Sequence, residues 1–219
     1  LSTFRGKGGL WEGHDVMEVA SPVAWKRNME LVLSFYNERR RQLLEVEPNK
    51  AHIAIAELEK DPDFNVHIVT QNVDDLHERA GSQQVLHLHG ELLKARSTRD
   101  DNLVYSWKKD LVKGDVCEKG AQLRPDVVWF GEAVPMMSPA AEIVQQSDAL
   151  IIVGTSLQVY PAASLLDFAD PACMIYYVDP DPGDHSSFYY NQKNLKIIAE
   201  PATKGIPSVL EEIKKTAST

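Results

Sequence analysis

The sequence has few of the features that mark membrane, secreted or nucleic-acid-binding proteins. Its 219 residues include two cysteines, Cys117 and Cys173, so it predicts no disulfide framework and favours a reducing, cytoplasmic setting. No apolar run approaches the roughly 20 residues that a membrane-spanning helix needs. The net charge of −9 argues against a nucleic-acid partner, because it offers no general positive field to phosphates. What remains, 43% hydrophobic and 25% charged residues, is typical of a globular protein.

Strand-like and helix-like segments alternate along most of the chain. The pattern predicts strands over residues 66–70, 85–90, 126–130, 149–153, 174–179 and 196–200. It predicts helices over residues 22–47, 50–60, 73–81, 138–148, 161–169 and 206–216. This alternation indicates an α/β fold with a parallel, Rossmann-like sheet. We expect one domain over 1–219, with a sheet lobe at about 1–20, 62–90 and 125–219 and a smaller lobe at about 21–61 and 91–124.

Two histidines alternate with leucines in the run "VLHLHG", which spans residues 85–90. In a β-strand, both imidazoles would point to one face and the leucines to the other. Three interpretations are open on this evidence alone. The histidines could bind a metal, one of them could act as a catalytic base, or both could be polar residues without a chemical role.

Polar residues follow several of the predicted strands, where ligands bind in open α/β sheets. A Gly-Thr-Ser turn after residues 149–153 could hold a phosphate or ribose, or could cap a helix. Asp179 could bind a ribose diol, or could form a turn beside Pro180. Residues 70–75 carry more amides and carboxylates than solubility requires, although a capping role for Asp74 or Asp75 is equally consistent.

Four motifs stand in the order and spacing of a known family. They are "TQNVDDLHERAG", "LHLHGELLKAR", "LRPDVVWFGE" and "VGTSLQVYPAA". With "STFRGKGGLW" near the start and Ala202 near the end, the whole chain resembles the sirtuins, which are NAD-dependent protein-lysine deacylases. The resemblance implies a Rossmann-like NAD domain with a small helical and zinc-bearing lobe.

The resemblance also assigns roles to individual residues. His89 takes the position of the general base and Asn72 that of a second catalytic residue, whereas His87 carries no catalytic role. In the implied reaction, the acyl oxygen attacks the ribose and nicotinamide leaves. The base then activates a ribose hydroxyl, and the products are nicotinamide, free lysine and O-acyl-ADP-ribose. An unperturbed pKa of about 6.5 suits a histidine to that step.

The remaining positions carried over are binding residues. The resemblance places NAD against Phe4, Arg5, Gln71, Asn72, Asp74, Gly154, Thr155, Ser156, Asp179 and Ala202. It places the acyl-lysine and its peptide backbone against Val128, Trp129 and Phe130. Asp179 departs from the family, which commonly has asparagine at that position.

One helix refines the expected substrate. Tyr36 and Arg39 lie one helical turn apart and match the Tyr-x-x-Arg pair of class III sirtuins, which remove succinyl and malonyl groups. An arginine fork and a phenol hydroxyl can hold the distal carboxylate of such a group. The alternative is a solvated basic face, and we expect Arg40 and Arg41 to form one.

Two features depart from the family pattern. Structural zinc in sirtuins uses four cysteines, but Ser97 and Asp100 replace the first pair and only Cys117 remains of the second, so we expect no metal. The chain also begins at the last residues of the family's glycine loop. We therefore expect that loop and the strand before it to be missing here, and to be present in the full-length protein.

The sequence thus predicts NAD-dependent removal of succinyl, malonyl and acetyl groups from protein lysines. A mono-ADP-ribosyltransferase and a non-catalytic module that binds NAD or acyl-lysine are the alternatives. We expect acylated lysine side chains of proteins as partners, no nucleic-acid or membrane partner, and a monomeric chain.

Overall fold

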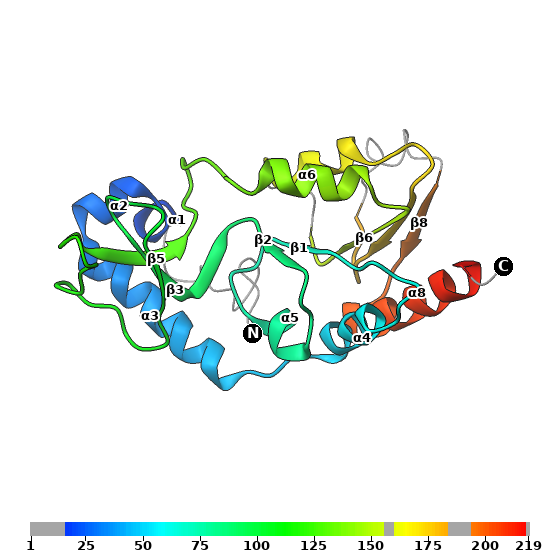
Figure 1. The fold of residues 1–219 in the computed structure, drawn as a ribbon, viewed down its shortest axis with the longest axis horizontal. Helices are drawn as coiled ribbons and strands as arrows, with labels where there is room; N and C mark the ends of the chain where they lie inside the picture. The colour runs from blue at the N-terminus through cyan, green and yellow to red at the C-terminus, as the bar shows by residue number, and fades with distance from the viewer. Residues whose placement is uncertain (1–15, 156–159, 184–193, 218–219) are drawn as a thin grey trace. The chain divides into compact units, whose positions relative to one another are not determined.

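The computed structural model describes residues 16–155, 160–183 and 194–217. The chain forms two compact units, each with a sheet of its own (Figure 1). Of the described residues, unit 1 comprises 16–47, 70–75 and 89–134, and unit 2 comprises 48–69, 76–88, 135–155, 160–183 and 194–217. No helix in the part of the chain that the structure describes is long and apolar enough to cross a membrane.

Unit 1 begins with three helices, which are α1 (Val16–Val19), α2 (Pro22–Arg27) and α3 (Met29–Glu45). Ser21 caps α2, since its hydroxyl accepts a hydrogen bond from the Ala24 amide at 3.0 Å and Pro22 follows it. The sequence predicted one helix here, but Asn28 has a non-helical backbone and interrupts it. The Asn28 side chain accepts from the Leu31 amide at 3.1 Å and so starts α3 as a new N-cap.

The unit 1 sheet is antiparallel, with the order β4-β3-β5. Its strands are β3 (Gly90–Ser97), β4 (Val104–Ser106) and β5 (Leu123–Val127). Ala95 lies opposite Tyr105 on one side and Pro125 on the other, and the β3–β5 register shifts between Glu91 and Ala95. Its core combines α3 with the sheet and the loops beyond it, through Leu33, Ala95, Leu111, Cys117, Ala121 and Leu123.

Unit 2 contains the predicted parallel sheet. Its strands are β6 (Ala149–Val153), β7 (Met174–Val178) and β8 (Leu195–Ile198), in the order β6-β7-β8. Ile151 lies opposite Tyr176, and Tyr176 lies opposite Lys196. The described helices of this unit include α4 (Lys50–Glu59), α6 (Met137–Gln145), the 3₁₀ helix η1 (Ala162–Phe168) and α8 (Ala202–Ala217).

Helix α4 packs in unit 2, although we expected residues 50–60 in the smaller lobe. Its Ala51 and Leu58 are buried in one cluster with Tyr176 of β7 and with Ile206 and Leu210 of α8. Figure 1 shows α4 and α8 side by side. The apolar face of α4 is therefore covered by α8 and the sheet, a partnership that its own amphipathic pattern cannot specify.

The run "VLHLHG" does not form one strand. Unit 2 also contains α5 (Leu76–Ala80), and β1 (Ile68–Thr70) pairs with β2 (Val85–His87), with the Ile68 amide donating to the Gln84 carbonyl at 2.9 Å. The chain then turns at residues 88–89, and β3 begins at Gly90. The expectation that both imidazoles share one strand face is therefore wrong.

Candidate active site

His89 lies against the polar loop at residues 70–75. Its Nδ1 atom is 3.1 Å from the backbone carbonyl oxygen of Gln71. A carbonyl oxygen can only accept a hydrogen bond, so Nδ1 must carry the proton in this contact. The neutral imidazole then keeps its lone pair on Nε2, which is the nitrogen that can act as a base.

The 70–75 loop is fixed by hydrogen bonds of its own backbone. The Asn72 amide donates to the Thr70 hydroxyl at 3.0 Å, and the Val73 carbonyl accepts from the Leu92 amide of β3 at 2.7 Å. Asn72 is exposed, whereas Gln71 and Asp74 are half-buried. Unit 1 therefore holds the imidazole of His89 beside a rigid, partly accessible polar loop.

The segment after β5 is joined directly to His89. The Val128 amide donates to the His89 carbonyl at 2.9 Å, and the Phe130 amide donates to the Ala20 carbonyl at 3.0 Å. Within the described residues, β5 is an edge strand of its sheet. Phe130 is 45% exposed, but Trp129 is only 2% exposed. Of these three residues, Trp129 alone is thus buried.

Tyr36 is also buried, on the inner side of α3. Its hydroxyl oxygen accepts a hydrogen bond from the indole Nε1 of Trp129 at 3.0 Å. Burial raises the pKa of Tyr36 well above its ordinary value. The phenol consequently keeps its proton at neutral pH and can donate a hydrogen bond.

The side chain of Arg39 is fixed by its neighbours, and 11% of its surface is exposed. Its guanidinium lies over the ring of Phe35, 3.3 Å from the centroid, and NH1 donates to the Phe35 carbonyl at 2.9 Å. The Glu38 carboxylate is 3.7 Å away. Burial lowers the pKa of Arg39, yet an arginine remains charged at neutral pH. These contacts do not fit the alternative of a solvated basic face.

An ion pair that the sequence analysis did not select supports Trp129. Arg124 NH1 and NH2 bind the two carboxylate oxygens of Glu132 at 2.6 and 3.0 Å. The same guanidinium lies 3.3 Å from the centroid of the Trp129 ring. Glu132 also accepts from the Trp129 amide at 2.7 Å. The available signal was a pair of opposite charges on either side of the segment "PDVVWFG".

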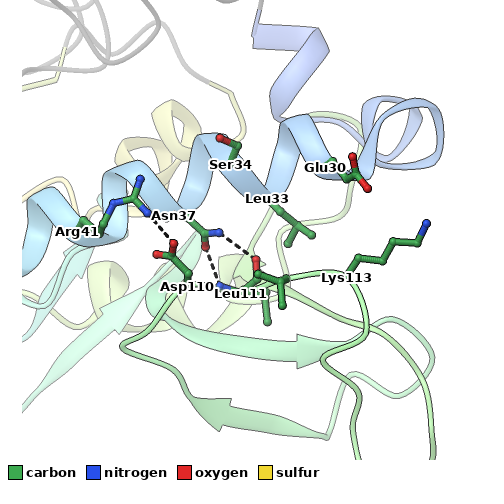
Figure 2. Close-up of a pocket in the computed structure, with 9 residues that line it drawn as sticks. Glu30, Leu33, Ser34, Asn37, Arg41, Asp110, Leu111 and Lys113 are labelled. Carbon is green, nitrogen blue, oxygen red and sulfur yellow. Dashed lines mark hydrogen bonds and ion pairs between the residues drawn. The ribbon is translucent and has the colours of Figure 1, made fainter.

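The expectation of a solvated Arg40 is wrong. This side chain is fully buried, with Nε donating to the Leu92 carbonyl at 3.1 Å and NH1 to the Asn37 carboxamide oxygen at 2.6 Å. Burial lowers the pKa of Arg40 to about 10. Arg41 is exposed and pairs with Asp110 at 2.6 Å. Figure 2 shows that pair in a groove of about 390 Å³ between α3 and residues 110–113, which none of the predicted site residues lines.

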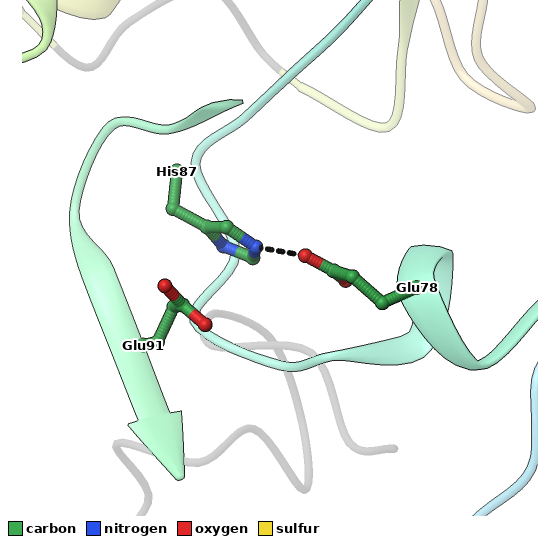
Figure 3. A group of neighbouring side chains, drawn as sticks. All are labelled: Glu78, His87 and Glu91. Carbon is green, nitrogen blue, oxygen red and sulfur yellow. Dashed lines mark hydrogen bonds and ion pairs between the residues drawn. The ribbon is translucent and has the colours of Figure 1, made fainter. Parts of the chain in front are cut away.

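His87 has a partner of its own in unit 2. Its Nε2 atom is 2.7 Å from a carboxylate oxygen of Glu78, as Figure 3 shows. The His87 side chain is 7% exposed. A carboxylate oxygen can only accept a hydrogen bond, so Nε2 carries a proton in this contact and His87 is held by Glu78.

The residues of unit 2 that are predicted to bind the nucleotide follow strands or begin a helix. Gly154 follows β6 with a φ of +62°, and its amide donates to the Val178 carbonyl at 3.3 Å. Asp179 follows β7, and its carboxylate accepts from the Asp181 amide at 2.8 Å, so it also forms the turn. Thr155 follows Gly154, and Ala202 begins α8. The predicted residues Phe4, Arg5 and Ser156 lie outside the described residues.

The residues at the expected zinc-ligand positions are engaged in other contacts. The Cys117 thiol donates to the Ser97 hydroxyl at 3.4 Å, and Asp100 pairs with the Lys119 ammonium at 2.7 Å. One thiol, one hydroxyl and a carboxylate already matched by a cation do not fit a structural zinc, which needs four ligands and strongly prefers thiolate or imidazole.

The chain is similar to known proteins over its whole length. Residues 1–161 match the model of the Sir2 family. A protein named NAD-dependent protein deacylase from Helicobacter pylori is 56% identical over 218 residues, covering 100% of this chain and 91% of that protein. One of the same name from Bacteroides thetaiotaomicron is 46% identical, with 98% and 90% covered. A solved Sir2 homolog–NAD complex has a TM-score of 0.83 at 36% identity, with 98% of this chain and 84% of that chain covered.

Gly90 sets the position of His89, which leads to a prediction about stability. A Cβ atom at Gly90 would lie 2.1 Å from the Asp126 carbonyl oxygen, and φ is +79°. Gly114 has a similar φ of +99°, but a Cβ there would meet nothing within 4 Å. Gly90→Ala should therefore lower the free energy of unfolding by about 1–3 kcal/mol more than Gly114→Ala. Denaturant melts of the two variants measure the difference, and equal losses would contradict the close approach.

Proposed function

This chain belongs to the Sir2 family, and we propose that it is an NAD-dependent protein-lysine deacylase that accepts acidic acyl groups as well as acetyl. The names of its relatives support the deacylase activity. The observation that carries the proposal is the contact of His89 Nδ1 with the Gln71 carbonyl, which leaves Nε2 as the basic nitrogen. A protein that only bound NAD or acyl-lysine would need no base held in one tautomer.

NAD is the second substrate of the proposed reaction, and it supplies the ADP-ribose that receives the acyl group. His89 Nε2 takes the proton of a ribose hydroxyl, which makes that oxygen a nucleophile toward the acyl carbon. The amide and carboxylate groups of the 70–75 loop and the strand-end residues of unit 2 have the chemistry that a dinucleotide requires. We assign NAD binding to Gln71, Asn72, Asp74, Gly154, Thr155 and Asp179.

We assign acyl recognition to Tyr36 and Arg39. A succinyl or malonyl group carries a carboxylate, and burying that charge without a partner would be strongly unfavourable. Arg39 supplies a cation, and Tyr36 keeps the proton of its hydroxyl for a hydrogen bond. An acetyl group carries no distal charge and needs neither residue.

Two further assignments complete the proposal. Both cysteines are free and buried, as expected of a protein from the reducing cytoplasm, where we place the activity. We also propose that the enzyme works without structural zinc, because the hydrogen bond of Cys117 to Ser97 and the ion pair of Asp100 with Lys119 occupy the ligand positions.

Loss of the base should abolish most of the activity. His89→Ala should lower the rate of deacylation at least ~10²-fold, the usual contribution of a general base, while NAD still binds. The matched control is His87→Ala, which removes a histidine that is paired with Glu78 and should cost far less. Nicotinamide release measures the rate and calorimetry measures NAD binding. Near-normal turnover of the His89 variant would rule out its role as the base.

Loss of the cation should separate the two classes of acyl group. Arg39→Met keeps an unbranched apolar side chain but removes the charge-assisted hydrogen bond, worth roughly 2–3 kcal/mol. The kcat/KM for succinyl-lysine should then fall roughly 30- to 150-fold, while that for acetyl-lysine stays within a few-fold. Arg41→Met, on the same helix but exposed, is the control and should leave both values unchanged. A parallel loss for both substrates would make Arg39 a structural residue.

The metal assignment is tested on the purified protein. Elemental analysis should find well below one zinc per chain, and EDTA should leave the melting temperature unchanged, because the lobe is closed by side-chain contacts. A stoichiometric zinc that survives dialysis would show that the 97–120 region binds metal.

A further inference from the structure

The hydrogen bond between two buried aromatic side chains suggests how the acyl selectivity is set. Trp129 and Tyr36 are 2% and 5% exposed, and the indole Nε1 lies 3.0 Å from the phenol oxygen. An indole N–H can only donate, so the phenol oxygen must be the acceptor. We infer that Trp129 is a positioning residue for acidic acyl groups, acting through Tyr36, an inference that rests on the proposed function.

The direction of the Tyr36 proton is the property that Trp129 fixes. A phenol hydroxyl both donates and accepts, and its hydrogen rotates to suit its neighbours. When Trp129 donates to the oxygen, the hydrogen of Tyr36 must point away from the indole. The phenol hydrogen is then oriented to donate to another group. Less freedom of rotation about the C–O bond is lost when a carboxylate binds.

The indole itself is held by a charged pair, Arg124 and Glu132. The Arg124 guanidinium lies over its ring at 3.3 Å, and Glu132 binds Arg124 through both oxygens. Glu132 also accepts from the backbone amide of Trp129, and Arg124 donates to the Val127 carbonyl at 2.9 Å. A charged pair therefore fixes both the ring and the backbone of Trp129, and through them the phenol of Tyr36.

The two kinds of substrate depend differently on this arrangement. A succinyl or malonyl carboxylate accepts the Tyr36 hydrogen. A misdirected hydroxyl therefore weakens binding of the acidic substrate and of its transition state alike. An acetyl group has no distal carboxylate to accept that hydrogen. Trp129 therefore affects the ratio of the two activities, whereas a residue with a purely structural role would lower both together.

The test compares Trp129→Phe, Tyr36→Phe and the double variant, with kcat/KM measured for succinyl- and acetyl-lysine peptides. Trp129→Phe keeps an aromatic ring under Arg124 but removes the N–H, and should lower the succinyl-to-acetyl ratio roughly 3- to 10-fold. In the Tyr36→Phe background the same change should leave the ratio unaltered, because its effect passes through the hydroxyl. Trp25→Phe is the matched control, because the ring centroids of Trp25 and Trp129 are 5.6 Å apart. This substitution should leave the ratio unchanged.

The outcomes separate this inference from the proposed function. If Arg39→Met and Tyr36→Phe change the ratio but Trp129→Phe does not, Trp129 is no positioning residue and acidic acyl recognition stands. If the effects of Trp129→Phe and Tyr36→Phe add in the double variant, Trp129 acts independently of Tyr36 and the inference is overturned. If no variant in the set changes the ratio, recognition of acidic acyl groups by Tyr36 and Arg39 is itself wrong.

Discussion

The hydrogen bond from the Val128 amide to the His89 carbonyl is the constraint on which the described site depends. It joins the turn that carries the base to the segment that carries Trp129. That turn holds His89 against the Gln71 carbonyl, and Trp129 contacts Tyr36 on α3. One backbone contact therefore links the group that would move a proton to the groups that would select the acyl chain.

This linkage requires a close approach of two backbones, and Gly90 permits it. With a positive φ and the Asp126 carbonyl where a Cβ would stand, no other residue could start β3 at that point without moving β5. A charged pair lies close to this contact. Arg124 and Glu132 form a largely buried pair with bidentate geometry, and the pair stabilises Trp129.

Much of the fold could be predicted from the sequence, because apolar runs and their periods are local. The parallel strands β6 and β7 fall where "ALIIV" and "MIYYV" predicted them. The break at Asn28 was missed, although an asparagine before Met-Glu is a recognisable helix cap. The packing of α4 on α8 could not be predicted, because an amphipathic helix does not reveal which surface covers it.

Only those residues of the candidate site that belong to recognisable motifs could be predicted from the sequence. His89, Tyr36 and Arg39 were selected through a family resemblance, and their roles remain predictions. The alternation in "VLHLHG" suggested one strand, but the conformation of Gly90 and its contact with Asp126 are tertiary facts. The burial of Arg40 likewise depends on Asn37 and on Leu92, a residue far along the chain. Contacts of that kind leave no trace in local sequence patterns.

The most direct measurement is the identity of the products formed from NAD and a succinyl-lysine peptide. Mass spectrometry of the reaction should detect O-succinyl-ADP-ribose and unmodified peptide, in amounts equal to the nicotinamide released. The same products with an acetyl group should form from an acetyl-lysine peptide. ADP-ribose attached to protein in place of the O-acyl product, or no consumption of NAD, would contradict the account.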